Sequence, residues 1–111
     1  MHTTALRRGT LEFCVLALLA DGERYGLDIA RQLGHSFGQT MSEGTVYPLL
    51  SRLRRAGSVG STLRESANGP SRRYYSLTAT GRAALDQFRS EWVEFRSAVD
   101  QMMGTDRHEQ A

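Results

Sequence analysis

The segment from Ser42 to Gly57 has one apolar side and one polar side at helical spacing. Its apolar residues recur at i, i+3, i+4 and i+7, which places them along one side of a helix. They are Val46, Leu49, Leu50 and Leu53. Ser42 or Thr45 can cap the start, and Gly57 can close the end in the left-handed conformation. The segment therefore predicts a helix that packs its apolar side onto a core.

The polar side of this helix combines hydroxyls, one aromatic ring and several arginines. It carries Tyr47, Ser51, Arg52, Arg54 and Arg55. Such a surface has the chemistry to enter a DNA major groove, although an ordinary amphipathic surface helix fits this segment equally well. Pro48 lacks a backbone donor. It lies in the first turn if Thr45 is the cap, and it kinks the helix if Ser42 is the cap.

The net charge of +2 conceals an asymmetry along the chain. Residues 1–82 contain 11 arginines and 6 acidic residues, a balance of +5, whereas residues 83–111 contain 3 arginines and 6 acidic residues, a balance of −3. The basic part suits a polyanion such as double-stranded DNA. All 14 basic side chains are arginines, which reflects GC-rich codon usage in a bacterium or a preference for bidentate contacts to phosphate and guanine.

Several classes of function find no support in the sequence. The longest apolar run, Phe13 to Ala20, is far shorter than the ~20 residues of a membrane span. The start of the chain also lacks the features of a signal peptide. We therefore expect a cytoplasmic protein that is not bound to a membrane. Cys14 lies in the apolar run, where burial is a simpler role than redox chemistry.

Nothing in the sequence has the pattern of an enzyme site. The histidines are scattered, at His2, His35 and His108. We find no pair with metal-ligand spacing, no phosphate-binding loop and no nucleophile elbow. We accordingly predict no catalytic residues, no metal site and no cofactor.

Two further helices are expected before Ser42. The first covers residues 5–20, and its apolar character from Leu11 onward requires cover on more than one side, which we attribute to a second chain. Gly22 can cap its end. The second helix is expected from Tyr25 to Leu33, followed by a polar link over residues 34–41.

After Gly57 the pattern changes from helical to alternating. Residues 59–65 alternate, turn-forming residues occupy 66–70, and residues 72–77 return, which predicts a β-hairpin. Arg64, Arg72 and Arg73 flank its tip, so the hairpin suits a phosphate backbone or a minor groove. A solvated surface hairpin is the alternative.

The last predicted helix runs from Ala79 to Met103, with Thr78 as its N-cap. Its apolar residues are spaced 3, 4, 3, 4, 3, which is an a/d seam of nearly three heptads. They are Leu85, Phe88, Trp92, Phe95, Val99 and Met102. The seam favours dimerisation through this helix, and packing onto the chain's own first helix is the alternative.

This order of elements predicts a mainly α chain with a β-hairpin, in the α+β class. We expect a winged helix-turn-helix over residues 1–77, a C-terminal dimerisation helix over 78–103 and a disordered tail over 104–111. The sequence also resembles the PadR family of bacterial transcriptional regulators, in particular its compact members. The resemblance rests on residues 6–12, 15–19, 25–29, 42–50, 52–53, 57, 72–75 and 77–81.

The resemblance implies a homodimeric repressor of an inverted-repeat operator, whose third helix reads the major groove. On matching positions, Ser42, Thr45, Tyr47, Pro48 and Ser51 would face DNA, and Arg72 and Arg73 of the wing would bind phosphate. Arg52 and Arg55 join this predicted DNA-binding set from the polar side of the helix. Tyr74 and Tyr75 would support the hairpin, at least one of them from the core. Leu27 and Asp28 depart from the aromatic residue and the glutamate that are frequent in the family.

Some compact members that this chain resembles bind flat aromatic compounds between their subunits, stacked on a tryptophan. Trp92 stands in the corresponding helix, which implies a small aromatic effector there. An anchor in the core or the interface is the alternative role of this ring. For the whole chain, the alternative is a winged-helix module that binds protein without specific DNA binding. That module accounts less well for the basic part of the chain.

Overall fold

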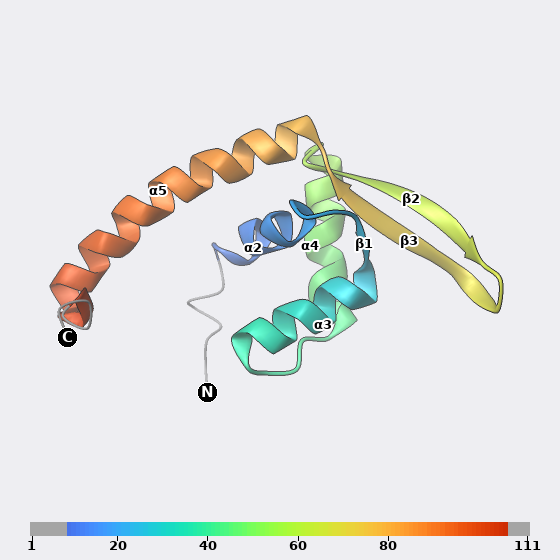
Figure 1. Cartoon of the computed structure of the whole chain (residues 1–111), viewed down its shortest axis with the longest axis horizontal. Helices are drawn as coiled ribbons and strands as arrows, with labels where there is room; N and C mark the ends of the chain where they lie inside the picture. Colours follow the sequence, from blue (N-terminus) through green and yellow to red (C-terminus); the bar gives the residue numbers. More distant parts are fainter. Residues whose placement is uncertain (1–8, 107–111) are drawn as a thin grey trace.

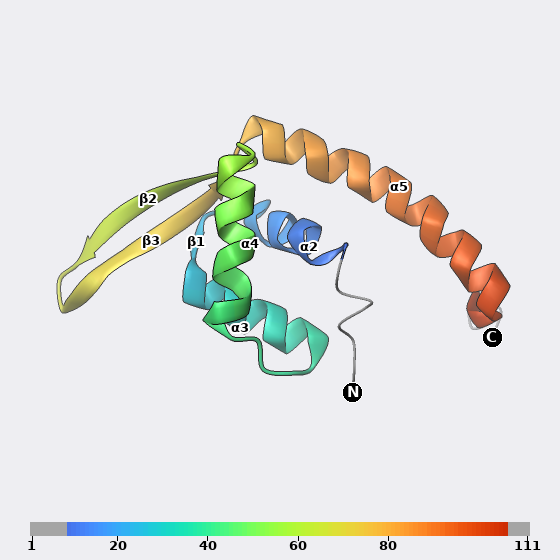
Figure 2. The same cartoon turned by 180° about the vertical axis from the view of Figure 1, so that it is seen from behind.

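The computed structural model describes residues 9–106. Its elements are α2 (Leu11–Leu19), β1 (Arg24–Tyr25), α3 (Gly26–Phe37), α4 (Glu43–Arg55), β2 (Val59–Ser66), β3 (Gly69–Leu77) and α5 (Ala79–Met103). Helices α2, α3 and α4 form a central body, from which the β2–β3 hairpin, called the wing below, projects on one side and α5 on the other (Figure 1). Figure 2 shows α4 crossing the front of this body. The predicted α+β winged helix is confirmed.

The core lies where the apolar sides of the body helices meet. The four apolar residues whose spacing predicted α4, Val46, Leu49, Leu50 and Leu53, are all buried. They meet apolar residues of α2 and α3, and the start of α5 adds Leu85. Burying each such side chain contributes about 1.5–3 kcal/mol. The main contributors are Val15, Leu16, Leu19, Ile29, Leu33, Val46, Leu50 and Leu53.

The ends of α4 show how the sequence sets its length. The Ser42 side chain accepts a hydrogen bond from the Thr45 backbone N–H at 3.2 Å, so Ser42, and not Thr45, is the cap. Pro48 therefore lies inside the helix, beyond its first turn. At the other end Gly57, with a φ of +79°, has the predicted left-handed conformation.

Helix α3 differs from its predicted bounds at both ends. It continues beyond Leu33 to Phe37 and is capped by Gly38, which has a φ of +69°. The helix continues through Gly34. The missing side chain of this glycine lets the returning chain pass close to the helix, since a Cβ there would lie 2.8 Å from the Gln39 carbonyl oxygen. Tyr25 belongs to the unpredicted strand β1, which is too short for a periodic signal.

The described part of the first helix begins at Leu11, after a turn at Gly9 and Thr10. Its predicted portion at residues 5–8 lies outside the described residues. The outer side of α2 is only partly buried, and Cys14 lies there. Burial raises the pKa of the Cys14 thiol, as desolvation disfavours the thiolate.

The strands form an antiparallel sheet in the order β1-β3-β2. The wing register pairs Arg64 with Arg72 and Leu63 with Arg73. Both strands extend closer to the tip than predicted, so that Pro70 lies within β3. This proline is tolerated because β1 pairs with β3 only much nearer the body, which leaves the other edge of β3 open at Pro70. Tyr75 is buried in the core, as predicted for at least one of the paired tyrosines.

Helix α5 has the predicted bounds, and its N-cap is Thr78, which accepts a hydrogen bond from the Gly81 N–H at 3.0 Å. Gly104, with a φ of +75°, ends the helix. Of the tail predicted to be disordered, residues 107–111 lie outside the described residues. None of the helices described between residues 9 and 106 is long and apolar enough to cross a membrane.

Candidate nucleic-acid interface

The first half of α4 presents its polar residues on the surface of the body. Ser42, Thr45, Tyr47 and Pro48 are exposed, and Ser51 is half-buried. They stay at the surface because the apolar residues between them face α2 and α3. These five predicted site residues are therefore accessible on α4 and its N-cap, near the end that usually approaches bases. Of the five, Tyr47 and Ser51 border the hollow described next.

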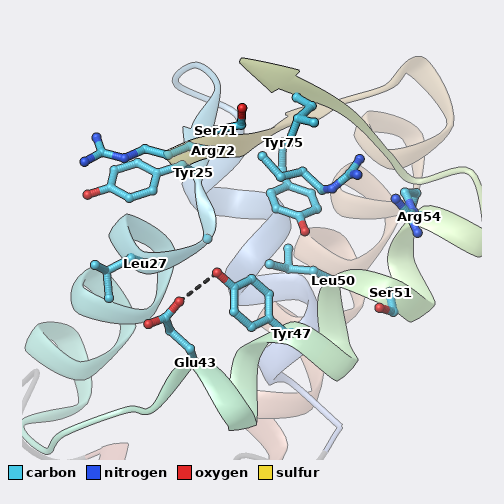
Figure 3. Close-up of a pocket in the computed structure, with 13 residues that line it drawn as sticks. Tyr25, Leu27, Glu43, Tyr47, Leu50, Ser51, Arg54, Ser71, Arg72 and Tyr75 are labelled. Atoms are coloured by element: carbon cyan, nitrogen blue, oxygen red, sulfur yellow. Dashed lines mark hydrogen bonds between the residues drawn. The ribbon is translucent and has the colours of Figure 1, made fainter. Parts of the chain in front are cut away.

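Beside this surface lies a hollow of about 580 Å³, bordered by the start of α3, by α4 and by the wing. In Figure 3 the Tyr47 ring lies in the middle of this hollow, with Tyr25 and Arg72 above it and Arg54 on the side of the wing. Its polar and aromatic lining consists of Tyr25, Glu43, Tyr47, Ser51, Arg54, Ser71, Arg72, Arg73 and Tyr75.

Three of the residues that border this hollow are arginines, one from α4 and two from the wing. Arg73 donates a hydrogen bond to Ser61 Oγ at 2.9 Å, and Arg54 donates to the same oxygen at 3.4 Å. The Arg72 guanidinium lies over the Tyr25 ring, 4.9 Å from its centroid. Stacking of this kind holds a guanidinium in place while its edge N–H groups stay available for a phosphate. The predicted pair of wing arginines thus lies next to α4.

Tyr47 and Glu43, both from α4, form a hydrogen-bonded pair in this hollow. The Tyr47 hydroxyl donates to Glu43 Oε2 at 2.7 Å, as the dashed line in Figure 3 shows. This bond, with smaller contributions from burial and from the negative charge of Glu43, raises the pKa of Tyr47 to about 12. The hydroxyl therefore remains a donor at neutral pH, and it is committed to the carboxylate.

Gly26 makes room for the Tyr47 ring. A Cβ at Gly26 would lie 2.5 Å from Tyr47 Cε1 and 2.9 Å from its hydroxyl oxygen. A Cβ does not approach a non-bonded ring carbon to 2.5 Å, so any side chain at position 26 would force the ring to move. The absence of a side chain at the start of α3 thus determines where the aromatic ring of α4 can lie.

Arg52 and Arg55 lie on another side of α4. Arg52 Nε bonds Glu12 Oε1 at 2.8 Å, and both arginines border a second hollow, of about 450 Å³, between α2, α4 and the start of α5. Arg52 is five residues from Tyr47, or about 140° around a helix, so the two cannot share a side. The predicted DNA-binding set is therefore divided between two sides of α4.

Several residues that border the Tyr47 hollow were not in the DNA-binding set predicted from the sequence, among them Arg54, Glu43 and Tyr25. Arg54 is seven residues after Tyr47, two turns along the same side, so helical spacing alone could have found it. Glu43 is four residues before Tyr47 and shares the same signal. Tyr25 comes from β1, whose approach to the wing has no counterpart in any local pattern. Within residues 9–106, no cluster of three or more acidic, histidine or cysteine side chains could hold a metal ion.

Comparisons with known proteins agree with this arrangement. The model of the transcriptional regulator PadR-like family matches residues 15–87. A transcriptional regulator of Mycobacterium tuberculosis is 36% identical over 93 residues, which are 84% of this chain and 85% of that protein.

Solved structures of PadR-like regulators also resemble this chain. A PadR-like transcriptional regulator from Bacillus cereus superposes with a TM-score of 0.81 at 31% identity, over 90% of this chain and 97% of that one. A PadR-like transcription factor from Bacteroides fragilis has a TM-score of 0.77 at 34% identity, over 90% and 96% of the two chains. With the basic hollow beside an exposed helix, these likenesses lead to one conclusion: the chain belongs to the PadR-like family of transcriptional regulators, which are DNA-binding proteins and not enzymes.

Proposed function

We propose that this regulator is a homodimeric repressor that places α4 in the major groove of an inverted-repeat operator. The observation that carries the proposal is that the exposed start of α4 and the wing arginines border one hollow. A duplex whose bases meet α4 would present its flanking phosphates to Arg72 and Arg73. A bacterial repressor of this kind would act in the cytoplasm, where the DNA that it binds is located.

Homodimerisation is supported by the uncovered apolar residues of α5. At its near end Phe88 stacks on Phe13 of α2, with ring centroids 4.1 Å apart. Further along, Phe95 is 63% exposed and Met102 is 75% exposed. An apolar stripe of this kind on a long helix is stable in water when a second copy covers it. Two recognition helices would then lie about 34 Å apart on the operator.

A small aromatic effector is the third part of the proposal. Trp92 lies between Phe88 and Phe95, with ring centroids 6.0 and 6.2 Å away. A planar compound could stack on this aromatic row at a dimer seam and favour one arrangement of the subunits. Titration with planar aromatic compounds should quench Trp92 fluorescence. Unchanged fluorescence at compound concentrations well above that of the protein would exclude this part.

The experiment for DNA binding is fluorescence anisotropy on DNA from upstream of the protein's own gene, with shuffled DNA as the control, at two salt concentrations. We expect tight binding to the first DNA and weak binding to the second. Affinity should fall steeply with salt, since arginine–phosphate contacts release counterions. Equally weak binding to both would send the search to other operators. Absence of any salt-sensitive binding would favour a protein partner instead.

Substitutions in α4 and in the wing test whether α4 reads bases while the wing binds phosphates. Tyr47→Ala should weaken specific binding more than non-specific binding. Arg72→Ala or Arg73→Ala should weaken both and reduce the salt slope by about 1. Equal losses from all three on specific and shuffled DNA would contradict this division.

A further inference from the structure

Glu43 is an acidic residue in a surface that is otherwise suited to a polyanion. It is the first residue of α4, it is exposed, and it borders the same hollow as Arg54 and Arg72. A carboxylate repels a phosphate, so this position works against binding of the DNA backbone. The partner that suits it is a hydrogen-bond donor, and the major groove offers such donors only on base edges.

The carboxylate is held in place through one of its oxygens. Tyr47 donates to Oε2 at 2.7 Å, and the Tyr47 ring occupies the space that the missing side chain of Gly26 leaves beside α3. Among residues 9–106 no other hydrogen bond or ion pair involves Glu43, so Oε1 remains able to accept. An acceptor whose rotamer is fixed before binding loses little conformational entropy when it meets a base, which sharpens discrimination.

The four bases differ in what they present to such an acceptor. Guanine presents two acceptors, and thymine presents an acceptor and a methyl group. Adenine places its N7 acceptor beside its amino group, where a carboxylate would be repelled. Cytosine presents only the N4 amino donor on its major-groove edge. A fixed carboxylate therefore selects cytosine over the other three bases.

We propose that Glu43 determines operator specificity by accepting a hydrogen bond from cytosine N4, with Tyr47 as the positioning residue that orients its carboxylate. The inference rests on the proposed docking of α4 in the major groove and adds the base that this helix prefers. It predicts a C·G pair, with cytosine on the contacted strand, at one symmetric position in each half-site.

The test is the base preference of the full-length protein. DNA selected from a random pool defines the preferred site, and anisotropy on single-base variants of that site measures discrimination at each position. The wild type should prefer cytosine at one position in each half-site. Glu43→Ala should lower that preference about tenfold and leave the other positions unchanged. Glu43→Gln should move the preference to adenine, because an amide bonds both N6 and N7.

Two further variants separate base reading from simpler effects. Glu65→Gln removes the same charge from an exposed position on the wing, so it controls for general electrostatic repulsion and should leave every base preference unchanged. Tyr47→Phe keeps the ring and removes the donor to Glu43. It should weaken discrimination at the cytosine position and at no other.

The outcomes are distinct. If Glu43→Gln and Glu43→Ala bind the selected site with the wild-type preference at every position, Glu43 only orients Tyr47 and the inference is wrong, while the proposed function stands. If the wild type selects no preferred site, the proposed function fails, and the inference fails with it. Should Glu43→Ala not fold, the shift expected for the isosteric Glu43→Gln decides the matter.

Discussion

Gly26 and Tyr47 show how one residue without a side chain can shape a binding surface. We expect Gly26→Ala to displace the Tyr47 ring, since its Cβ would lie 2.5 Å from Cε1, and so to weaken specific DNA binding. In a Tyr47→Ala background the same change should cost almost nothing, giving a coupling of about 1 kcal/mol or more by anisotropy. Gly60→Ala is the matched control, because its Cβ meets its nearest neighbour at 3.6 Å. Additive losses would mean that Gly26 acts independently of the ring.

The Tyr47–Glu43 bond also predicts a pH effect that needs no DNA. The pKa of Tyr47 is raised from 10.0 to about 12, so the folded state holds this proton more tightly than the unfolded state does. The resulting stability is fully present below pH 10.0 and is lost as the pH rises towards about 12. Tyrosinate absorbance, taken as the difference between wild type and Tyr47→Phe, should show this titration.

Glu43→Gln is the partner variant in that titration. It removes the charge that favours the protonated hydroxyl, so the pKa of Tyr47 should move down towards its ordinary value. A wild-type Tyr47 that titrates at 10.0 would show that the pair does not persist in solution.

At the scale of elements, the start of α5 is fixed tightly to the turn between α4 and β2. The Thr78 hydroxyl donates to the Gly57 carbonyl oxygen at 2.6 Å, and the Thr78 N–H donates to that of Ser58 at 3.2 Å. Gly81 completes the contact, because a Cβ there would lie 2.0 Å from the Ser58 carbonyl oxygen. This joint sets the direction of α5 relative to α4, and with it the geometry that a dimer through α5 would impose on DNA.

The joint predicts a stability effect. Gly81→Ala places a methyl group against backbone, which cannot rotate away as a side chain can, and we expect a loss of about 2 kcal/mol. Urea unfolding at one fixed protein concentration measures the loss, since coupled association would otherwise change the midpoint. Gly60→Ala again serves as the control. An unchanged urea midpoint for Gly81→Ala would show that the backbone around Ser58 can shift to accommodate a methyl group without loss of stability.

At the scale of the whole molecule, α5 reaches away from the body and leaves apolar residues uncovered (Figure 1). Phe95, 63% exposed, lies on the heptad seam, while Val93, 57% exposed, lies off it. Phe95→Asp should weaken the dimer about tenfold or more in sedimentation velocity and should abolish cooperative operator binding. Val93→Asp, with the same new charge two residues away, should do neither. If both substitutions weakened the dimer equally, the dimer contact would not be confined to the heptad seam of α5.

How well the sequence predicts each structural feature depends on how far apart in the sequence the interacting residues are. The helical period over Val46, Leu49, Leu50 and Leu53 and the caps at Ser42, Gly57 and Thr78 depend on neighbours within a few positions. These predictions are confirmed. The predicted end of α3 at Leu33 was wrong, since the helix continues to Phe37. Gly34 was interpreted as a helix breaker from its propensity, but it is a glycine because the returning chain passes close to it.

The sequence by itself determined the helices and the hairpin, their order, their buried sides and the family, because these follow from local periods, caps and short motifs, whereas β1 is too short to have such a signal. Only the tertiary structure decided which polar residues share a surface. It placed Tyr47 of α4 against Gly26 of α3, brought the wing arginines beside them, and turned Arg52 away towards Glu12. The physical reason is that such contacts depend on how helices dock and how strands register, over separations for which a local pattern carries no signal.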